Sequence, residues 1–227
     1  MNLRVRAVTG AGMALLLAAG CARAPLRIPK AEIARLRAEP EIRVVRYAPA
    51  TITVQTRGGD AARQFGLLGL GVGQSVDQGI RSKLMNELGL QDPAPAVGDR
   101  LAAAFTADLG LTNLRPIEQP APSDDLDELR RRFGGGGALD VKTLVWWLAY
   151  DASATDAYRL LYAARARLVR LEGAAVIWEA TCDRPVGDSP TAKPDELTAN
   201  GGALLKQRAA ESVDWCARRL LRELRGR

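Results

Sequence analysis

The chain of 227 residues is mildly basic, with 32 Lys and Arg against 26 Asp and Glu, and it contains no histidine. Its 47% hydrophobic content provides enough apolar side chains for a core and excludes a chain that is disordered throughout. The lack of histidine excludes Ser–His and Cys–His nucleophile pairs and histidine metal sites. We therefore expect a protein that is not an enzyme, needs no cofactor and is too weakly charged to bind nucleic acid.

Residues 1–20 have the pattern of a secretory signal peptide. Two arginines precede an apolar run, and small residues then lead to a cysteine in the stretch Leu17-Ala18-Ala19-Gly20-Cys21. This stretch resembles the lipobox of bacterial lipoproteins, although Ala18 stands where leucine is commoner. The resemblance implies cleavage after Gly20 and acylation of Cys21, including palmitate. The alternative is an ordinary signal peptide followed by an incidental cysteine.

Membrane attachment is expected to depend on the lipid at Cys21. No later apolar run reaches the roughly 20 residues that are needed to cross a bilayer. Ala22 follows the cysteine, at a position where aspartate would favour retention in the inner membrane. The lipoprotein resemblance therefore implies an outer-membrane anchor, with the protein facing the periplasm.

Residues 21–41 contain three prolines and alternating charges, which predicts a lipidated tether with at most a short helix near residues 31–38. Twenty extended residues reach about 65 Å, so such a tether would let the folded part stand clear of the lipid. The remaining residues, 42–227, are predicted to form a single periplasmic α/β (α+β) domain. Its sheet is expected to be mixed or antiparallel, with a long hairpin packed by helices.

Short elements are predicted in the first part of this domain. Residues 42–56 are rich in Val, Ile and Thr, which predicts a strand or hairpin interrupted at Pro49. The Gly-rich apolar segment 65–73 lacks the spacing of a dinucleotide-binding loop. It fits either a buried segment leading into a helix over 75–88 or a face that packs on helices or touches the membrane.

A helix is predicted from Asp92 to Gly110, followed by a short strand over 111–117. Ser123 is then expected to cap a polar helix with aspartates in its first turn. Its last turn holds three arginines, which complement the helix dipole: Arg130, Arg131 and Arg132. These arginines are either a solvated helix end or a surface for an anionic partner.

Two strands over 141–150 and 158–171 are predicted in the second half, and the latter forms a hairpin with 174–182. Arg165 and Arg167 alternate with apolar residues on the middle strand. They are interpreted as a possible partner surface, with an ordinary charged sheet face as the alternative.

A long helix over 202–225 closes the chain, and its apolar stripe includes Cys216. Cys182 ends the preceding strand. In an oxidising periplasm this pair predicts a disulfide that joins the last helix to the sheet, and two buried free thiols are the alternative. The adjacent Trp146 and Trp147 must face opposite sides of their strand. Core packing is the first interpretation of the tryptophans, and stacking on envelope sugars is the second.

The element order from Asp92 to Arg227, with a strand that contains Trp178, resembles the anticodon-binding-like domain of several envelope lipoproteins. That family implies protein–protein contacts at the envelope and no catalytic residues. We therefore predict a lipid-anchored envelope lipoprotein that serves assembly or regulation as a non-enzymatic accessory. The alternative is a binding module for an anionic envelope glycan or lipid.

Overall fold

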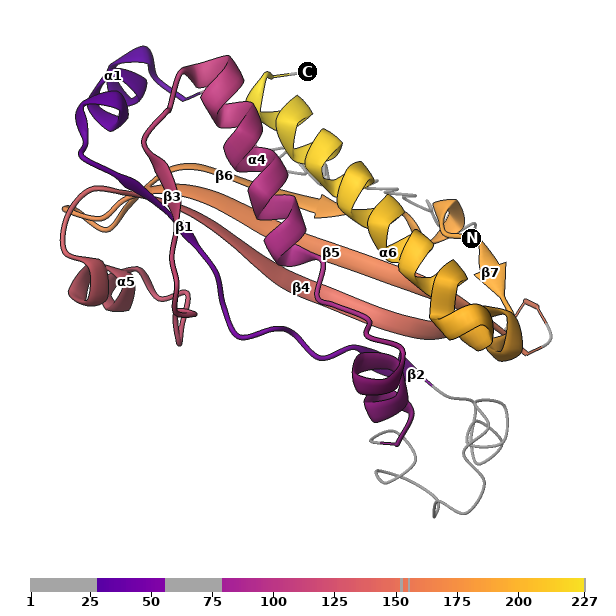
Figure 1. The fold of residues 1–227 in the computed structure, drawn as a ribbon. Helices are drawn as coiled ribbons and strands as arrows, with labels where there is room; N and C mark the ends of the chain where they lie inside the picture. The colour runs from indigo at the N-terminus through magenta and orange to yellow at the C-terminus, as the bar shows by residue number, and fades with distance from the viewer. Residues whose placement is uncertain (1–27, 56–78, 152, 155, 227) are drawn as a thin grey trace, which may run out of the picture.

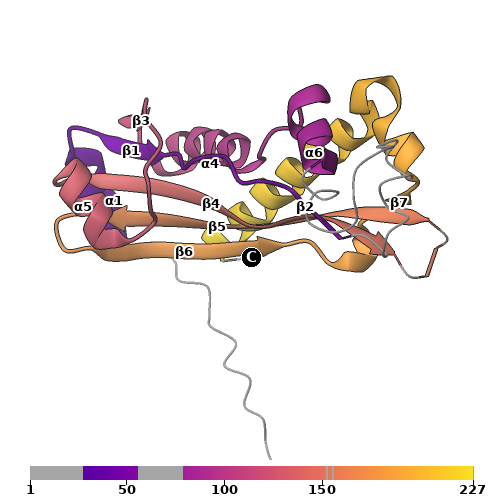
Figure 2. The same cartoon turned by 90° about the horizontal axis from the view of Figure 1, so that it is seen from below.

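The computed structural model describes residues 28–55, 79–151, 153–154 and 156–226. They form a single α/β domain in which helices α4 (Ala94–Leu109) and α6 (Pro194–Leu224) lie across one face of a mixed sheet of seven strands (Figures 1 and 2). The predicted fold class, including the long C-terminal helix, is confirmed. The predicted signal peptide, Cys21 and the Gly-rich segment 65–73 lie outside the described residues.

The strand order in the sheet is β3-β1-β4-β5-β6, while β2 also pairs with β4 and β7 with β5. Strands β4, β5 and β6 are antiparallel, whereas β1 and β2 pair with β4 in parallel and β3 pairs with β1 in parallel. The strands are β1 (Ile42–Val45), β2 (Thr53–Gln55), β3 (Leu114–Pro116), β4 (Gly137–Asp151), β5 (Ala157–Arg170), β6 (Ala175–Asp183) and β7 (Thr191–Ala192). The predicted hairpin of residues 158–171 and 174–182 is therefore present as β5 and β6, and β6 comes last in the strand order.

Strands β1 and β2 lie one after the other along the same edge of β4, so residues 42–55 form an interrupted strand and not a hairpin. Pro49 lies in the connector between them, where its missing N–H costs no strand pairing. Asp92 links this connector to β4 through hydrogen bonds. Its carboxylate accepts hydrogen bonds from the Ala50 amide at 2.8 Å and from the Thr143 hydroxyl at 2.5 Å.

The helices follow the predicted apolar stripes, with local differences. Helix α4 ends at Gly110, whose φ of 63° is the left-handed conformation that glycine adopts readily. Helix α6 starts earlier than predicted and is kinked over Ala199–Gly202, where three successive residues have positive φ. Residues 79–87 are helical, with a π turn over Lys83–Glu87. The other helices are α1 (Lys30–Ala38), α5 (Leu126–Phe133) and the 3₁₀ turn η3 (Val186–Asp188).

Helix α1 belongs to the folded domain. Leu36 is only 2% exposed within the main core, and Glu32 forms an ion pair with Arg170 of β5 at 2.7 Å. The Asn113 amide also donates to the carbonyls of Leu36 and Glu39. The domain therefore begins well before residue 42, and the described part of the predicted tether is packed on the sheet.

Cys182 at the end of β6 is disulfide-bonded to Cys216 of α6, with the Cα atoms 5.2 Å apart. Both side chains are fully buried. The bond joins the C-terminal helix to the sheet across the core, which is the role that the position of Cys216 on the inner stripe predicted.

Candidate protein-contact surface

The candidate site lies on the sheet face opposite α4 and α6, which we call the outer face. Residues that are directly paired on neighbouring strands point to the same side of a sheet. The register therefore gives the outer face row by row. Four of these rows are Asp140–Arg167, Lys142–Arg165, Val145–Ala163 and Trp147–Leu161. The first two rows belong to what we call the covered half, and the last two belong to the uncovered half.

Residues 117–133, which we call the arm, pack over the covered half and include α5. Leu129 of α5 and Ala121 of the arm are buried in a small apolar cluster with sheet residues such as Ala138 and Val169. The Ala121 amide also donates to the Arg46 carbonyl at 2.7 Å. The arm is therefore a packed part of the domain.

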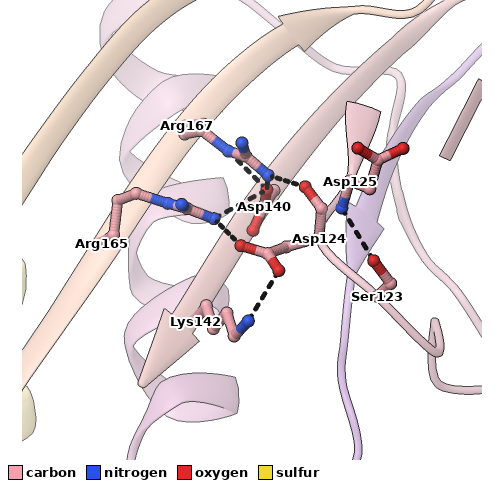
Figure 3. A network of polar contacts seen from close by, with 7 residues as sticks. All are labelled: Ser123, Asp124, Asp125, Asp140, Lys142, Arg165 and Arg167. Carbon is pink, nitrogen blue, oxygen red and sulfur yellow. Dashed lines mark hydrogen bonds and ion pairs between the residues drawn. The ribbon is translucent and has the colours of Figure 1, made fainter. Parts of the chain in front are cut away.

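An ion network fixes the arm to the sheet (Figure 3). The Asp124 carboxylate of the arm accepts hydrogen bonds from Lys142 at 2.6 Å and from Arg165 at 2.7 Å. Arg167 donates to the carboxylate of Asp140, with its Nε at 2.7 Å, and also to the backbone carbonyl of Asp124 at 2.7 Å. Asp140 is fully buried. Three cations of two strands thus converge on two carboxylates.

The network changes the acidity of its members. Partial burial acts to raise the pKa of Asp124, but the hydrogen bonds and charges of Lys142 and Arg165 outweigh it and lower the pKa well below the usual range. Burial, followed by the nearby Asp140 carboxylate, raises the pKa of Tyr47 above its ordinary value. Asp124 is therefore an anion at neutral pH, and Tyr47 is a neutral phenol.

Arg165 and Arg167 are not available as the partner surface that the sequence suggested. Their side chains are only 19% and 8% exposed, because the arm covers this part of the outer face. The α5 arginines are exposed at the helix end, and the N-cap of α5 is Asp125, not Ser123. Ser123 instead accepts a hydrogen bond from the Asp125 amide. The two arginine groups therefore do not form one surface.

The uncovered half presents apolar side chains to solvent. Trp147 is 38% exposed and Leu144, at a β-bulge, is 50% exposed. Leu161 lies directly opposite Trp147 on β5, and Thr53 lies opposite it on β2. The outer-face neighbour Ala149 is too small to cover the indole ring. Exposed apolar clusters of this kind mark interaction surfaces.

The two adjacent tryptophans have opposite environments. Trp146 is 2% exposed and belongs to the main core, whereas Trp147 is on the outer face. Strand alternation predicted their opposite directions, but core packing was the first interpretation for both. The exposure of Trp147 was missed because it depends on where the arm ends, and no local pattern encodes that.

Two hollows, of about 210 and 510 Å³, border the β1–β2 connector and the start of α4. Their shared polar residues are already engaged. Arg46 pairs with Asp99 at 2.9 Å, and Asp92 accepts the hydrogen bonds described above and one from the Ala94 amide. No group of three metal-ligating side chains occurs among the described residues. These hollows provide no convergent catalytic set.

Comparisons with known proteins place the chain only remotely. No family model and no curated protein matches it. Among solved structures it is similar to the PelC dodecamer from Paraburkholderia phytofirmans, with 15% identity over 83% of this chain and 89% of that chain and a TM-score of 0.30. It is also similar to protein XCC0632 (DUF330) from Xanthomonas campestris, with 15% identity over 81% and 85% and a TM-score of 0.36.

Proposed function

We propose that the protein is an envelope lipoprotein, anchored in the outer membrane through Cys21, that assists the assembly or regulation of an envelope complex without catalysing a reaction. It does so by binding a partner protein on the uncovered half of the outer face. The observation that carries the proposal is the exposed Trp147 on the central strand β4, opposite the half-buried Leu161 of β5 and three residues after the exposed Leu144.

The composition of the uncovered half fits a protein interface. Tryptophan is enriched among the residues that dominate binding energy, and interfaces combine an apolar centre with a polar rim. Here the centre is Trp147 with Leu161, and the outer-face positions beside them are Thr53, Gln55 and Arg159. The partner is expected to present apolar or aromatic side chains to the indole ring.

The anchor is supported by the Leu17–Cys21 stretch. Among the described helices, none is long and apolar enough to cross a membrane. We expect Cys21→Ser to abolish palmitate labelling and to release the protein from the membrane fraction. If the variant stayed in that fraction without label, the proposed anchor would be wrong.

The contact surface can be tested by in-cell photo-cross-linking. A photoreactive phenylalanine analogue at position 147 should capture one defined envelope protein at near-stoichiometric yield. The same analogue at Lys206, an exposed position on α6, is the matched control and should capture none. Capture of glycan or lipid alone at position 147 would overturn the proposal in favour of a glycan- or lipid-binding module.

A further inference from the structure

A second surface lies where three helix segments meet at one end of the domain. Figure 1 shows the C-terminal end of α4 between α1 and the C-terminal end of α6. The Arg37 side chain of α1 donates to the Leu109 carbonyl of α4 at 2.9 Å. Arg225 at the end of α6 pairs with Asp108 of α4 at 2.5 Å. We call this surface, formed by α1, the last turn of α4 and residues 216–226, the basic corner.

Cations outnumber carboxylates at the basic corner by seven to three. The cations are Lys30, Arg35, Arg37, Arg218, Arg219, Arg222 and Arg225, and the carboxylates are Glu32, Asp108 and Glu223. Each carboxylate already forms an ion pair with a cation of the corner. Within the described residues, Lys30, Arg218 and Arg222 are exposed and have no carboxylate partner.

The helix dipole accounts for only one of the three exposed, unpaired cations of the basic corner. Cations near a helix C-terminus are favoured by the dipole, which applies to Arg222 in the last turn of α6. Lys30 is in the first turn of α1, where the dipole disfavours a positive charge. Arg218 lies too far from the end of α6 to gain from it, because the effect is confined to the last turn. The dipole therefore leaves the exposed charges of Lys30 and Arg218 unexplained.

The chain length between the proposed anchor and the domain limits how far the basic corner can lie from the membrane. Because α1 is packed on the sheet, only residues 22–27 separate Cys21 from the described chain at Ile28. Such a segment spans at most about 25 Å when it is fully extended. The proposed lipid anchor therefore holds the α1 end of the domain close to the bilayer surface.

We propose that the basic corner rests on anionic phospholipid headgroups. This inference rests on the acylation of Cys21 in the proposed function. Basic residues near an anionic leaflet and an acyl anchor reinforce each other, because both hold the same end of the chain at the surface. Trp147 lies ten residues along β4 from Gly137, where β4 pairs with β1, or about 33 Å along the strand. Docking at the corner would leave the uncovered half free for a protein.

The test uses the acylated protein reconstituted in vesicles, with a fluorophore attached at Ala31 on the exposed side of α1. Because the anchor alone keeps this site within about 25 Å of the bilayer, the readout must act at contact range. Quenching of the fluorophore by nitroxide-labelled headgroups should be strong in vesicles of phosphatidylcholine and phosphatidylglycerol in equal parts, and weak in phosphatidylcholine alone. Lys30→Gln, Arg218→Gln and Arg222→Gln together should reduce the equilibrium constant for docking, by roughly fivefold per cation. High salt should have a similar effect.

A matched variant removes three exposed or half-exposed cations away from the corner, Arg131→Gln, Arg184→Gln and Lys206→Gln, and should dock like the wild type. The inference would be overturned if both triple variants lost quenching equally. It would also be overturned if quenching were equal in neutral and anionic vesicles. The acyl anchor is the same in every sample. Absent docking in a protein that carries palmitate would therefore count against the basic corner alone, whereas absent palmitate would count against the proposed function.

Discussion

The covered and uncovered halves of the outer face are built from the same strands and differ in which side chains they hide. In the covered half, Asp140 and Arg167 are buried beneath the arm. In the uncovered half, Trp147 and Leu144 are in solvent. A buried Asp–Arg pair on the same sheet face as a partly exposed tryptophan reverses the usual distribution of polar and apolar side chains.

The difference follows from what the arm can reach. Asp124 supplies the charge that allows Arg165 and Lys142 to lie beneath it, so the arm covers these rows without leaving unpaired cations. No described element continues over the Trp147 row. Breaking a buried ion pair is costly, so the network favours the arrangement in which Asp124 lies over Lys142 and Arg165.

The largest expected effect is on the covered half, where Asp140→Ala should leave the buried Arg167 guanidinium without its carboxylate. Removing one partner of a buried ion pair typically destabilises a protein by about 3–5 kcal/mol. The free energy of unfolding from chemical denaturation should fall by that amount. The double variant Asp140→Leu with Arg167→Met should recover most of the loss, because it removes both charges and keeps the volume. A double variant as unstable as Asp140→Ala would show that packing, not charge, holds this row.

A smaller effect is expected from the partly exposed Asp124. The pKa of this carboxyl is lowered on folding, so its contribution is complete above the unfolded value of 3.8 and is lost as the pH falls through the lower folded value. Asp124→Asn should cost about 1 kcal/mol at neutral pH after allowance for solvent screening. The difference between wild type and variant should shrink below about pH 4. A difference that stayed constant down to the acid limit of folding would contradict the proposed role of the charge.

Strand and helix patterns were sufficient to predict the fold class and the position of the hairpin. The stripe of α6 from Leu205 to Leu224 is buried as its periodicity indicated. The prediction was wrong where two distant segments meet. The strand predicted over 141–150 excluded Asp140, but this residue lies inside β4 and pairs across to Arg167. Nothing in the local sequence shows that residue 124 will lie above residue 165.

The same reason explains the error about α1. Proline, alternating charge and a short helix are typical of a tether, and the local sequence around Leu36 is unremarkable. The helix is held by long-range contacts, namely the Glu32–Arg170 pair and the hydrogen bonds from Asn113. These contacts depend on where the end of β5 and the start of β3 lie in the folded domain. Periodicity reports which face of an element is apolar, but not which distant segment will cover it.

The smallest stability effect is expected in the uncovered half, and it separates function from folding most clearly. Trp147→Ser removes a side chain that is 38% exposed and lies between the cross-strand neighbours Thr53 and Leu161, so the free energy of unfolding should change by less than about 1 kcal/mol. Its neighbour provides the matched control, because Trp146→Ala opens a cavity in the core and should cost about 3–5 kcal/mol.

Trp147→Ser should reduce partner recovery strongly, although it changes the free energy of unfolding only slightly. If Trp147 is the centre of the interface, Trp147→Ser should weaken partner capture by roughly thirtyfold or more, as expected for a central tryptophan worth at least about 2 kcal/mol. Capture can be measured by affinity purification of tagged variants from envelope extracts, at temperatures where both remain folded. A Trp147→Ser protein that is stable and still recovers its partner at wild-type yield would mean that the bare apolar rows are not the contact surface, and that the partner binds elsewhere on the domain.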